Sequence, residues 1–292
     1  MKDLPFDPST LTREKLRGVG VGLSSEVVHI AGTNIVAKIP APQDLEDQKV
    51  EKRIYERLQG HPNILRYLGQ SPPACTLLRN ALLFEYHRHG SLIDCLDKIV
   101  PGRSRWPSQA VSAVAYIHSK GVVHGDIGLH NFLLHDDGRL VLCDFAGSGL
   151  DELPPNVSAG VRYLNPLFDS DYPSERDDVF ALGTVLYELD RGERLFEGKS
   201  DREIRQCLRN KQFPDLSLVS SPLRQVIEKC WTVPDYKAGN AWIELGRYTT
   251  LSLGRPNLST ETQPTFIINS WFSGLLGLAV GAVGAVLVFT LA

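Results

Sequence analysis

Two neighbouring stretches decide the fold: VVHGDIGLHNFLL at residues 122–134 and LCDFAG at residues 142–147. They contain a His-x-Asp motif, His124 and Asp126, with Asn131 five residues after the Asp. A second aspartate, Asp144, follows thirteen residues after the Asn. Apolar runs bound each of these polar groups, and short runs of this kind predict short strands. We therefore expect the polar side chains to lie on rigid loops between strands.

This spacing is the layout of a phosphoryl-transfer site. An aspartate on a rigid loop can accept the proton of an attacking hydroxyl group, which makes Asp126 the predicted catalytic base. An asparagine and a second aspartate supply oxygen ligands to Mg²⁺ ions that bridge ATP phosphates, so Asn131 and Asp144 are the predicted metal ligands. ATP and Mg²⁺ are the expected cofactors.

The same stretch resembles the catalytic loop of eukaryotic protein kinases, which reads His-Arg-Asp-Leu-Lys-x-x-Asn. This chain keeps the His, the Asp and the Asn but has Gly125 for the Arg and Gly128 for the Lys. The family's Asp-Phe-Gly motif appears as Asp144-Phe145-Ala146. Within this superfamily the chain is similar to fungal-type protein kinase domain proteins. The resemblance implies a bilobal α+β fold, with a small antiparallel-sheet N-lobe, a helical C-lobe and Mg-ATP in the cleft between them.

Upstream motifs extend the resemblance. The stretch GVGLSSEV resembles the glycine-rich loop, with Gly20 and Gly22 as its glycines and Ser25 where a third glycine usually stands. The following VAKI stretch resembles the strand that carries the ATP-binding lysine, which is Lys38. A glycine pair alone is weak support, but its order ahead of the lysine strand and the catalytic loop makes it strong.

A helix is predicted over residues 46–58. Its apolar residues Val50, Ile54 and Leu58 recur at four-residue spacing, which gives one buried face. The resemblance makes Glu51 the glutamate that pairs with the strand lysine and fixes it against the ATP phosphates.

Residues 82–87, LLFEYH, resemble the strand that runs into the hinge. Backbone groups of Glu85 and His87 would bind adenine, and Phe84 would be the gatekeeper. The full set of ATP-binding residues implied by the resemblance is Gly20, Gly22, Val27, Ala37, Lys38, Glu85, His87 and Leu133.

Departures from the family pattern bear on activity and regulation. Gly128 removes a lysine that stabilises the transferring phosphate, but the threonine that it normally meets is also absent, replaced by Gly160. His-Gly-Asp also occurs in small-molecule kinases that work without this lysine. Gly125 removes the arginine that would hold a phosphorylated activation loop, so we expect no regulation of that kind.

Composition sets further limits. The chain has 292 residues, 42% of them hydrophobic, and a net charge of −3, with basic residues scattered rather than clustered. These values suit a two-lobed globular unit and indicate no nucleic-acid partner. The five cysteines show no metal spacing, and the N-terminus has no apolar core typical of a secretory signal.

The C-terminal stretch 272–292 contains no charged residue. About 20 apolar residues suffice to cross a bilayer, so this stretch predicts a transmembrane tail anchor with the kinase unit on the cytosolic side. Its GxxxG spacing, Gly277 to Gly281, would allow self-association of helices. If the tail were a gene-model artefact, the chain would be cytoplasmic.

Four segments are thus expected: an N-terminal extension at 1–15, a kinase-like domain at 16–245, a flexible linker at 246–271 and the membrane helix at 272–292. The favoured function is transfer of the ATP γ-phosphate to a Ser, Thr or Tyr hydroxyl of a protein substrate. A membrane-tethered pseudokinase scaffold is the alternative. A third hypothesis is a small-molecule kinase. The HPNI motif at residues 61–64, which is typical of protein kinases, argues against it.

Overall fold

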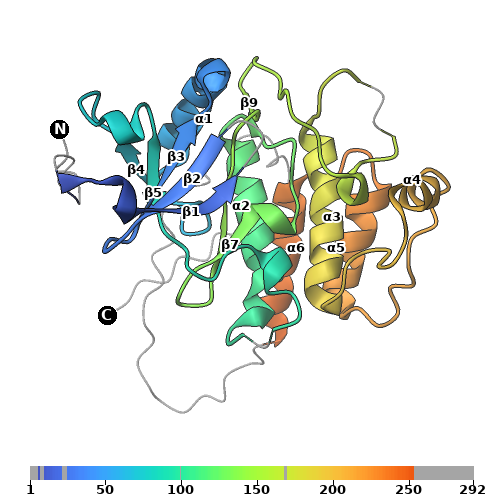
Figure 1. Ribbon diagram of the computed structural model, residues 1–292. Coiled ribbons are helices and arrows are strands. Elements are labelled where there is room, and N and C mark those ends of the chain that lie inside the picture. Colours follow the sequence, from blue (N-terminus) through green and yellow to red (C-terminus); the bar gives the residue numbers. More distant parts are fainter. Residues whose placement is uncertain (1–5, 7–9, 22–24, 99, 168–169, 253–292) are drawn as a thin grey trace, which may run out of the picture. The chain divides into compact units, whose positions relative to one another are not determined.

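The computed structural model describes Phe6 and residues 10–21, 25–98, 100–167 and 170–252, and these residues form two lobes (Figure 1). The N-lobe carries an antiparallel sheet and one long helix. The C-lobe is mainly helical. The expected bilobal kinase fold is therefore confirmed.

The N-lobe sheet has the strand order β1-β2-β3-β5-β4, and every neighbouring pair is antiparallel. Its strands are β1 Leu16–Val21, β2 Ser25–Ile30, β3 Ile35–Pro40, β4 Tyr67–Gln70 and β5 Leu82–Glu85. Helix α1, Leu45–Leu58, is the helix expected over 46–58, and it buries Glu51, Ile54 and Leu58 on one side.

Strand β3 shows how the sheet divides its side chains between two cores. Ile35 and Ala37 pack into a small cluster on the outer face, whereas Val36 belongs to the large core that continues into the C-lobe. Successive strand residues point to opposite faces, which explains the alternation. Lys38 shares the parity of Val36 and therefore points toward the cleft.

The C-lobe is built around α3, which is buried along most of its length. Helix α3 packs against α2 and α5, and α6 packs against α2 (Figure 1). A capping box of Ser174 and Asp177 starts α3, and Gly192, with a φ of 72°, ends it. The helices are α2 Trp106–Ser119, α3 Glu175–Arg191, α4 Asp201–Arg209, α5 Ser221–Thr232 and α6 Ala238–Ser252.

Two short two-stranded sheets flank the loops of the catalytic stretch. Strands β6 Val122–Val123 and β9 Gly149–Leu150 pair antiparallel, as do β7 Phe132–Leu134 and β8 Leu140–Leu142. The catalytic loop leaves β6 and enters β7, and the Asp144 motif follows β8. The polar residues are therefore on loops between short strands, as the sequence predicts.

The boundary expected at residue 245 needs a correction. Helix α6 runs to Ser252, so the first part of the segment expected as a linker is helical. Ala238, Ala241 and Leu245 recur at helical spacing and are buried, which ties the helix to the core, and Gly246 does not end it.

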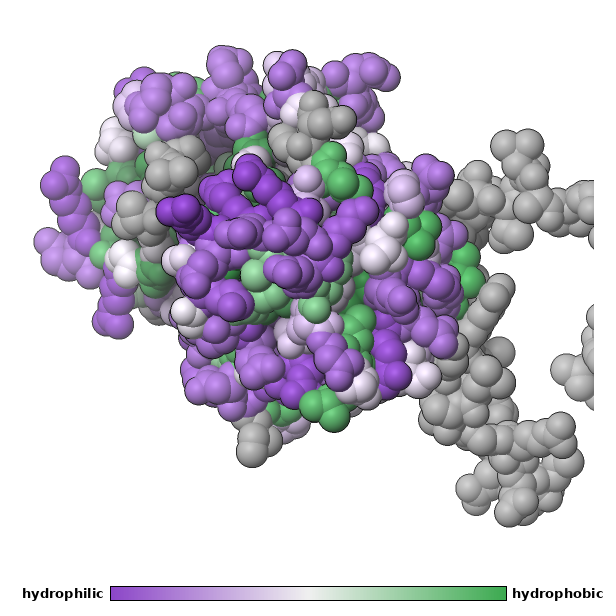
Figure 2. All heavy atoms as spheres, turned by 90° about the vertical axis from the view of Figure 1, so that its right-hand side faces the viewer, coloured by the Kyte–Doolittle hydropathy of each residue, from purple (hydrophilic) through white to green (hydrophobic). Residues whose placement is uncertain are grey.

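The expected membrane helix at 272–292 and the rest of the linker lie outside the described residues. Among the residues that are described, no helix is both long and apolar enough to cross a bilayer. Figure 2 faces the side on which α4 lies in Figure 1, and hydrophilic residues cover most of it.

Candidate functional site

A cavity of about 540 Å³ lies between the lobes. Most residues expected to bind ATP or metal line it: Gly20, Val27, Lys38, Glu51, Glu85, His87, Asn131, Leu133 and Asp144. Gly22 lies outside the described residues. Asp126 does not line the cavity itself but contacts two residues that do, His130 and Asn131.

Ala37 was a wrong assignment. Its side chain is fully buried in the outer N-lobe cluster, against residues such as Val28 and Leu83. Val36 lines the cavity in its place. The residue before Lys38 must face away from the cleft because side chains alternate along a strand.

Lys38 lies at the centre of a buried charge cluster. Its Nζ donates to Glu51 Oε1 and to Asp144 Oδ1, each at 2.7 Å. Glu51 is 1% exposed and Lys38 8%. Burial disfavours the charged ammonium, but the two carboxylates outweigh it and raise the pKa of Lys38 above its usual value. The structure thus brings together three residues from β3, α1 and the loop after β8.

Asp144 adopts a left-handed backbone conformation with a φ of 61°. Its backbone N–H donates to the Tyr55 hydroxyl at 3.1 Å, which anchors the turn to α1. The next residue, Phe145, is fully buried, with its ring 5.1 Å from that of Tyr55 and 5.0 Å from that of His124. Burial acts to raise the pKa of Asp144, but the Lys38 ammonium holds it below its usual value.

Asp178, at the start of α3, fixes the catalytic loop. Its carboxylate accepts hydrogen bonds from the backbone N–H groups of His124 at 2.7 Å and Gly125 at 2.8 Å. His118 Nε2 lies 3.0 Å from the same group. Because Asp178 is 1% exposed, these contacts satisfy a buried charge while they hold the loop in place.

Asp126 contacts two later residues of the same loop, Asn131 and His130. Asn131 Nδ2 donates to the Asp126 backbone oxygen at 2.8 Å and to Oδ2 at 3.1 Å. His130 Nε2 lies 3.0 Å from the same Oδ2. Burial acts to raise the pKa of Asp126, but the bond and charge of His130, with help from His124 and Asn131, lower it. The carboxylate is therefore ionised at neutral pH and able to accept a proton.

Asn131 and Asp144 have the oxygen donors that a hard divalent cation prefers. The Asn131 amide nitrogen is engaged with Asp126, which leaves its carbonyl oxygen for a cation. Asp144 accepts the Lys38 hydrogen bond with Oδ1, which leaves Oδ2 for a cation. The described residues hold no group of three or more His, Cys, Asp or Glu side chains arranged for a metal, so a cation here would rely on this pair and on phosphate oxygens.

The hinge residues expected to face adenine line the cavity. Phe84, in β5, is buried and lines the cavity. The His87 carbonyl accepts a bond from Gly90 N–H at 3.1 Å, which turns the chain after the hinge. Burial lowers the pKa of the His87 imidazole to about 4, so the ring is neutral at physiological pH.

The segment from Asp144 to Pro166 resembles the family's activation segment and is given that name below. It packs closely against Gly125, whose φ is 80°. A Cβ atom added at Gly125 would lie 3.1 Å from Val157 atoms and 3.2 Å from Pro155. The space of the family's arginine is therefore occupied by the segment itself. Asp151 of the same segment forms a bidentate pair with Arg57 of α1, at 2.5 and 2.8 Å.

A buried cluster that the sequence did not reveal anchors the end of this segment. Tyr163 donates its hydroxyl to Glu188 Oε2 at 2.7 Å, and Arg194 Nε donates to Glu188 Oε1 at 3.1 Å. Glu188 is fully buried in α3. It anchors the end of the segment through Tyr163. Only tertiary packing brings these residues together, so no local motif could have indicated them.

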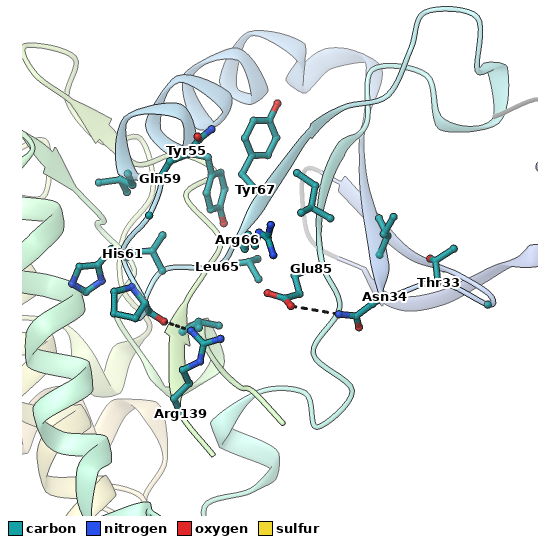
Figure 3. Close-up of a pocket in the computed structure, with 18 residues that line it drawn as sticks. Thr33, Asn34, Tyr55, Gln59, His61, Leu65, Arg66, Tyr67, Glu85 and Arg139 are labelled. Atoms are coloured by element: carbon teal, nitrogen blue, oxygen red, sulfur yellow. Dashed lines mark hydrogen bonds between the residues drawn. The ribbon is translucent and has the colours of Figure 1, made fainter. Parts of the chain in front are cut away.

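A second cavity, of about 860 Å³, lies behind the hinge and is not the candidate site. Figure 3 shows its lining, with Arg139 bonded to the Pro62 carbonyl at 2.8 Å and Asn34 directed toward Glu85. Lys38, Asn131 and Asp144 do not line it. The larger cavity therefore lacks the residues suited to phosphate chemistry.

Comparison with known proteins agrees with this geometry. Residues 13–237 match the family described as protein kinase domain. A probable serine/threonine-protein kinase of Dictyostelium discoideum is 30% identical over 202 residues, which are 65% of this chain and 21% of the relative. CBL-interacting protein kinase 25 of Oryza sativa subsp. japonica is 30% identical over 209 residues, 64% of this chain and 40% of the relative. Aurora kinase A-B of Xenopus laevis is 27% identical over 217 residues, which are 67% of this chain and 50% of the relative. The chain spans at most half the length of these relatives.

Proposed function

The chain belongs to the protein kinase family, and from this premise we propose that it transfers the γ-phosphate of Mg-ATP to a hydroxyl group of a protein substrate. The observation that carries the proposal is the cluster of Lys38 with Glu51 and Asp144 in the same cavity as Asn131. Lys38 lines this cavity and its raised pKa keeps it charged, which supports a role in holding the ATP phosphates. A scaffold without nucleotide chemistry would need no such cluster.

In this proposal Asp126 accepts the proton of the attacking hydroxyl. The hydroxyl oxygen forms a new bond to the γ-phosphorus, the bond from that phosphorus to the oxygen of ADP breaks, and the proton passes to Asp126. Its lowered pKa keeps the carboxylate in the accepting form. Phosphoryl transfer demands mainly positioning and charge stabilisation, which the rigid loop around Asp178 supplies.

Lys38 would hold the α- and β-phosphates, and the Glu85 and His87 backbone would hold adenine. Asn131 and Asp144 would hold the divalent cation. When bound, that cation neutralises charge on the phosphate oxygens.

The test is a substrate panel. Full-length protein purified in detergent is incubated with Mg-ATP and, separately, mixed protein substrates, an aminoglycoside and choline, with phosphoamino-acid analysis of labelled protein. We expect label only in protein. Label in the small molecules alone would replace the proposal with a small-molecule kinase, and nucleotide binding without any label would replace it with a pseudokinase.

Helix α1 is tied to the activation segment without any phosphate. Besides the Arg57–Asp151 pair, Asn156 Nδ2 donates to Asp47 Oδ1 of α1 at 3.2 Å. We infer that Glu51 is kept in place by these contacts, so that an added phosphate has little left to order.

We therefore expect Ser158→Glu and Ser158→Ala to leave kcat within about twofold of wild type, because Gly125 offers no cationic side chain to a loop phosphate. Initial-rate measurements on the three proteins check this. Activation of about tenfold or more by Ser158→Glu would show that the segment is phosphate-regulated after all.

We also propose that residues 272–292 anchor the chain in a membrane, because their uncharged, apolar sequence is suited to a bilayer-spanning helix. The full-length protein should sediment with membranes and resist carbonate extraction, whereas a chain ended after Ser270 should not sediment. Full-length protein recovered entirely in the supernatant would refute the anchor and leave the kinase proposal untouched.

A further inference from the structure

His130 makes a contact that neither the motif pattern nor the proposed reaction accounts for. It lies on the one-turn 3-10 helix Leu129–Asn131, and its Nε2 is 3.0 Å from Asp126 Oδ2. A carboxylate oxygen accepts hydrogen bonds, so we assign the imidazole as the donor, from Nε2. His130 also lines the cavity between the lobes, and its side chain is 37% exposed.

The position of the His130 imidazole depends on the absence of a side chain at Gly128. A Cβ atom added at Gly128 would lie 2.5 Å from His130 Cε1 and 2.7 Å from Nδ1, and 2.9 Å from Tyr163 Cε2. A side chain at residue 128 would therefore displace the imidazole from Asp126. Gly128 therefore does more than omit the family's lysine: it leaves the space that the His130 imidazole occupies.

The hydrogen bonds at Asp126 are unequally divided between its two oxygens. Oδ2 accepts from both His130 Nε2 and Asn131 Nδ2. Among the described residues, Oδ1 has no hydrogen-bond donor. The pair of donors fixes the rotation of the carboxylate and leaves one oxygen for an incoming hydroxyl.

We propose that His130 is the positioning residue of this site: it donates from Nε2 to Asp126 Oδ2, in the space that Gly128 opens, and so aims Oδ1 at the substrate hydroxyl. This assignment rests on the proposed phosphoryl transfer, since it names the group that orients the base of that reaction. Tyr163 also lies near His130, with 6.1 Å between the two ring centroids, and its hydroxyl is bound to Glu188.

The first test compares three substitutions in the full-length protein. His130→Ala removes the donor and should lower kcat by about 10²-fold, the loss typical of a misplaced reacting group, with KM for ATP changed less than about threefold. His130→Gln places an amide N–H near the Nε2 position and should restore kcat to within about tenfold of wild type. His130→Asn reaches only the Nδ1 position and should stay as low as His130→Ala. His89→Ala, which removes a half-exposed histidine paired with Asp136, is the matched control and should leave kcat unchanged.

The second test is a double-mutant cycle with Gly128→Ala. In the wild-type background Gly128→Ala should lower kcat about as much as His130→Ala, because the new methyl group displaces the imidazole. In the His130→Ala background the same substitution should cost much less, with only the Tyr163 contact left to disturb. Strong non-additivity supports the reciprocal packing.

The outcomes separate this inference from the proposed function. If wild type transfers phosphate and Asp126→Asn does not, but His130→Ala keeps its kcat, or Gln and Asn behave alike, the positioning role is refuted and the kinase proposal stands. Additive losses in the cycle refute the reciprocal packing. A wild-type protein that binds ATP and transfers nothing overturns both.

Discussion

Asp126→Asn should lower kcat for phosphate transfer by about 10²–10⁴-fold, the range that a positioned general base contributes. Asparagine matches the shape of aspartate but cannot accept the hydroxyl proton. The affinity for Mg-ATP should stay within about twofold, because Asp126 lies outside the lining of the cavity and its partner Asn131 remains. Initial rates at saturating ATP and titration calorimetry measure the two quantities.

A matched control is Asp136→Asn. Asp136 is also an ion-paired aspartate, bound to Arg88 at the surface, and it contacts none of the candidate residues. Its substitution should leave kcat unchanged. If Asp126→Asn kept more than about a tenth of the wild-type kcat, another group would have to be the base.

Lys38→Met should lower both the affinity for Mg-ATP and the free energy of unfolding. The substitution leaves Glu51, which is 1% exposed, as an uncompensated buried charge beside Asp144. Breaking one side of a buried ion pair typically costs about 3–5 kcal/mol of the free energy of unfolding. The Mg-ATP dissociation constant should rise by at least about tenfold, since the group proposed to hold the phosphates is gone.

The double substitution Lys38→Met with Glu51→Gln separates these effects. It removes the orphaned charge, so urea denaturation should show most of the lost stability regained, while calorimetry should show Mg-ATP affinity still reduced. The control is Lys49→Met, which changes an exposed lysine of α1, the helix that carries Glu51. It should change neither stability nor Mg-ATP affinity. Unchanged nucleotide affinity in Lys38→Met would place the ATP site elsewhere.

The sequence predicted those parts of the site that depend on local spacing. The helix of Glu51 followed from its four-residue apolar period, and its pairing with Lys38 came from the order of known motifs. The same reasoning missed Val36, although strand parity alone would have selected it over Ala37, since only the former shares a face with Lys38.

Other features could not be predicted because they depend on how distant segments meet. Glu188 and Arg194 reach Tyr163 only once α3 is packed against the activation segment. His130 reaches back to Asp126 because the chain takes one 3-10 turn there, which no periodicity indicates. Helix α6 continues through Gly246 to Ser252, because a single glycine weakens a helix without ending one whose earlier turns are buried.

The most direct measurement of the central claim is the fate of labelled ATP. Full-length protein in detergent is incubated with mixed protein substrates and Mg²⁺ plus either γ-³²P-labelled or α-³²P-labelled ATP, beside the Asp126→Asn protein. A protein kinase that uses Asp126 as base transfers label only from the γ position, releases one ADP for each phosphate transferred, and loses both signals in Asp126→Asn. Measurable ATP binding with no γ-label above the Asp126→Asn background would contradict the account and identify the protein as a nucleotide-binding pseudokinase.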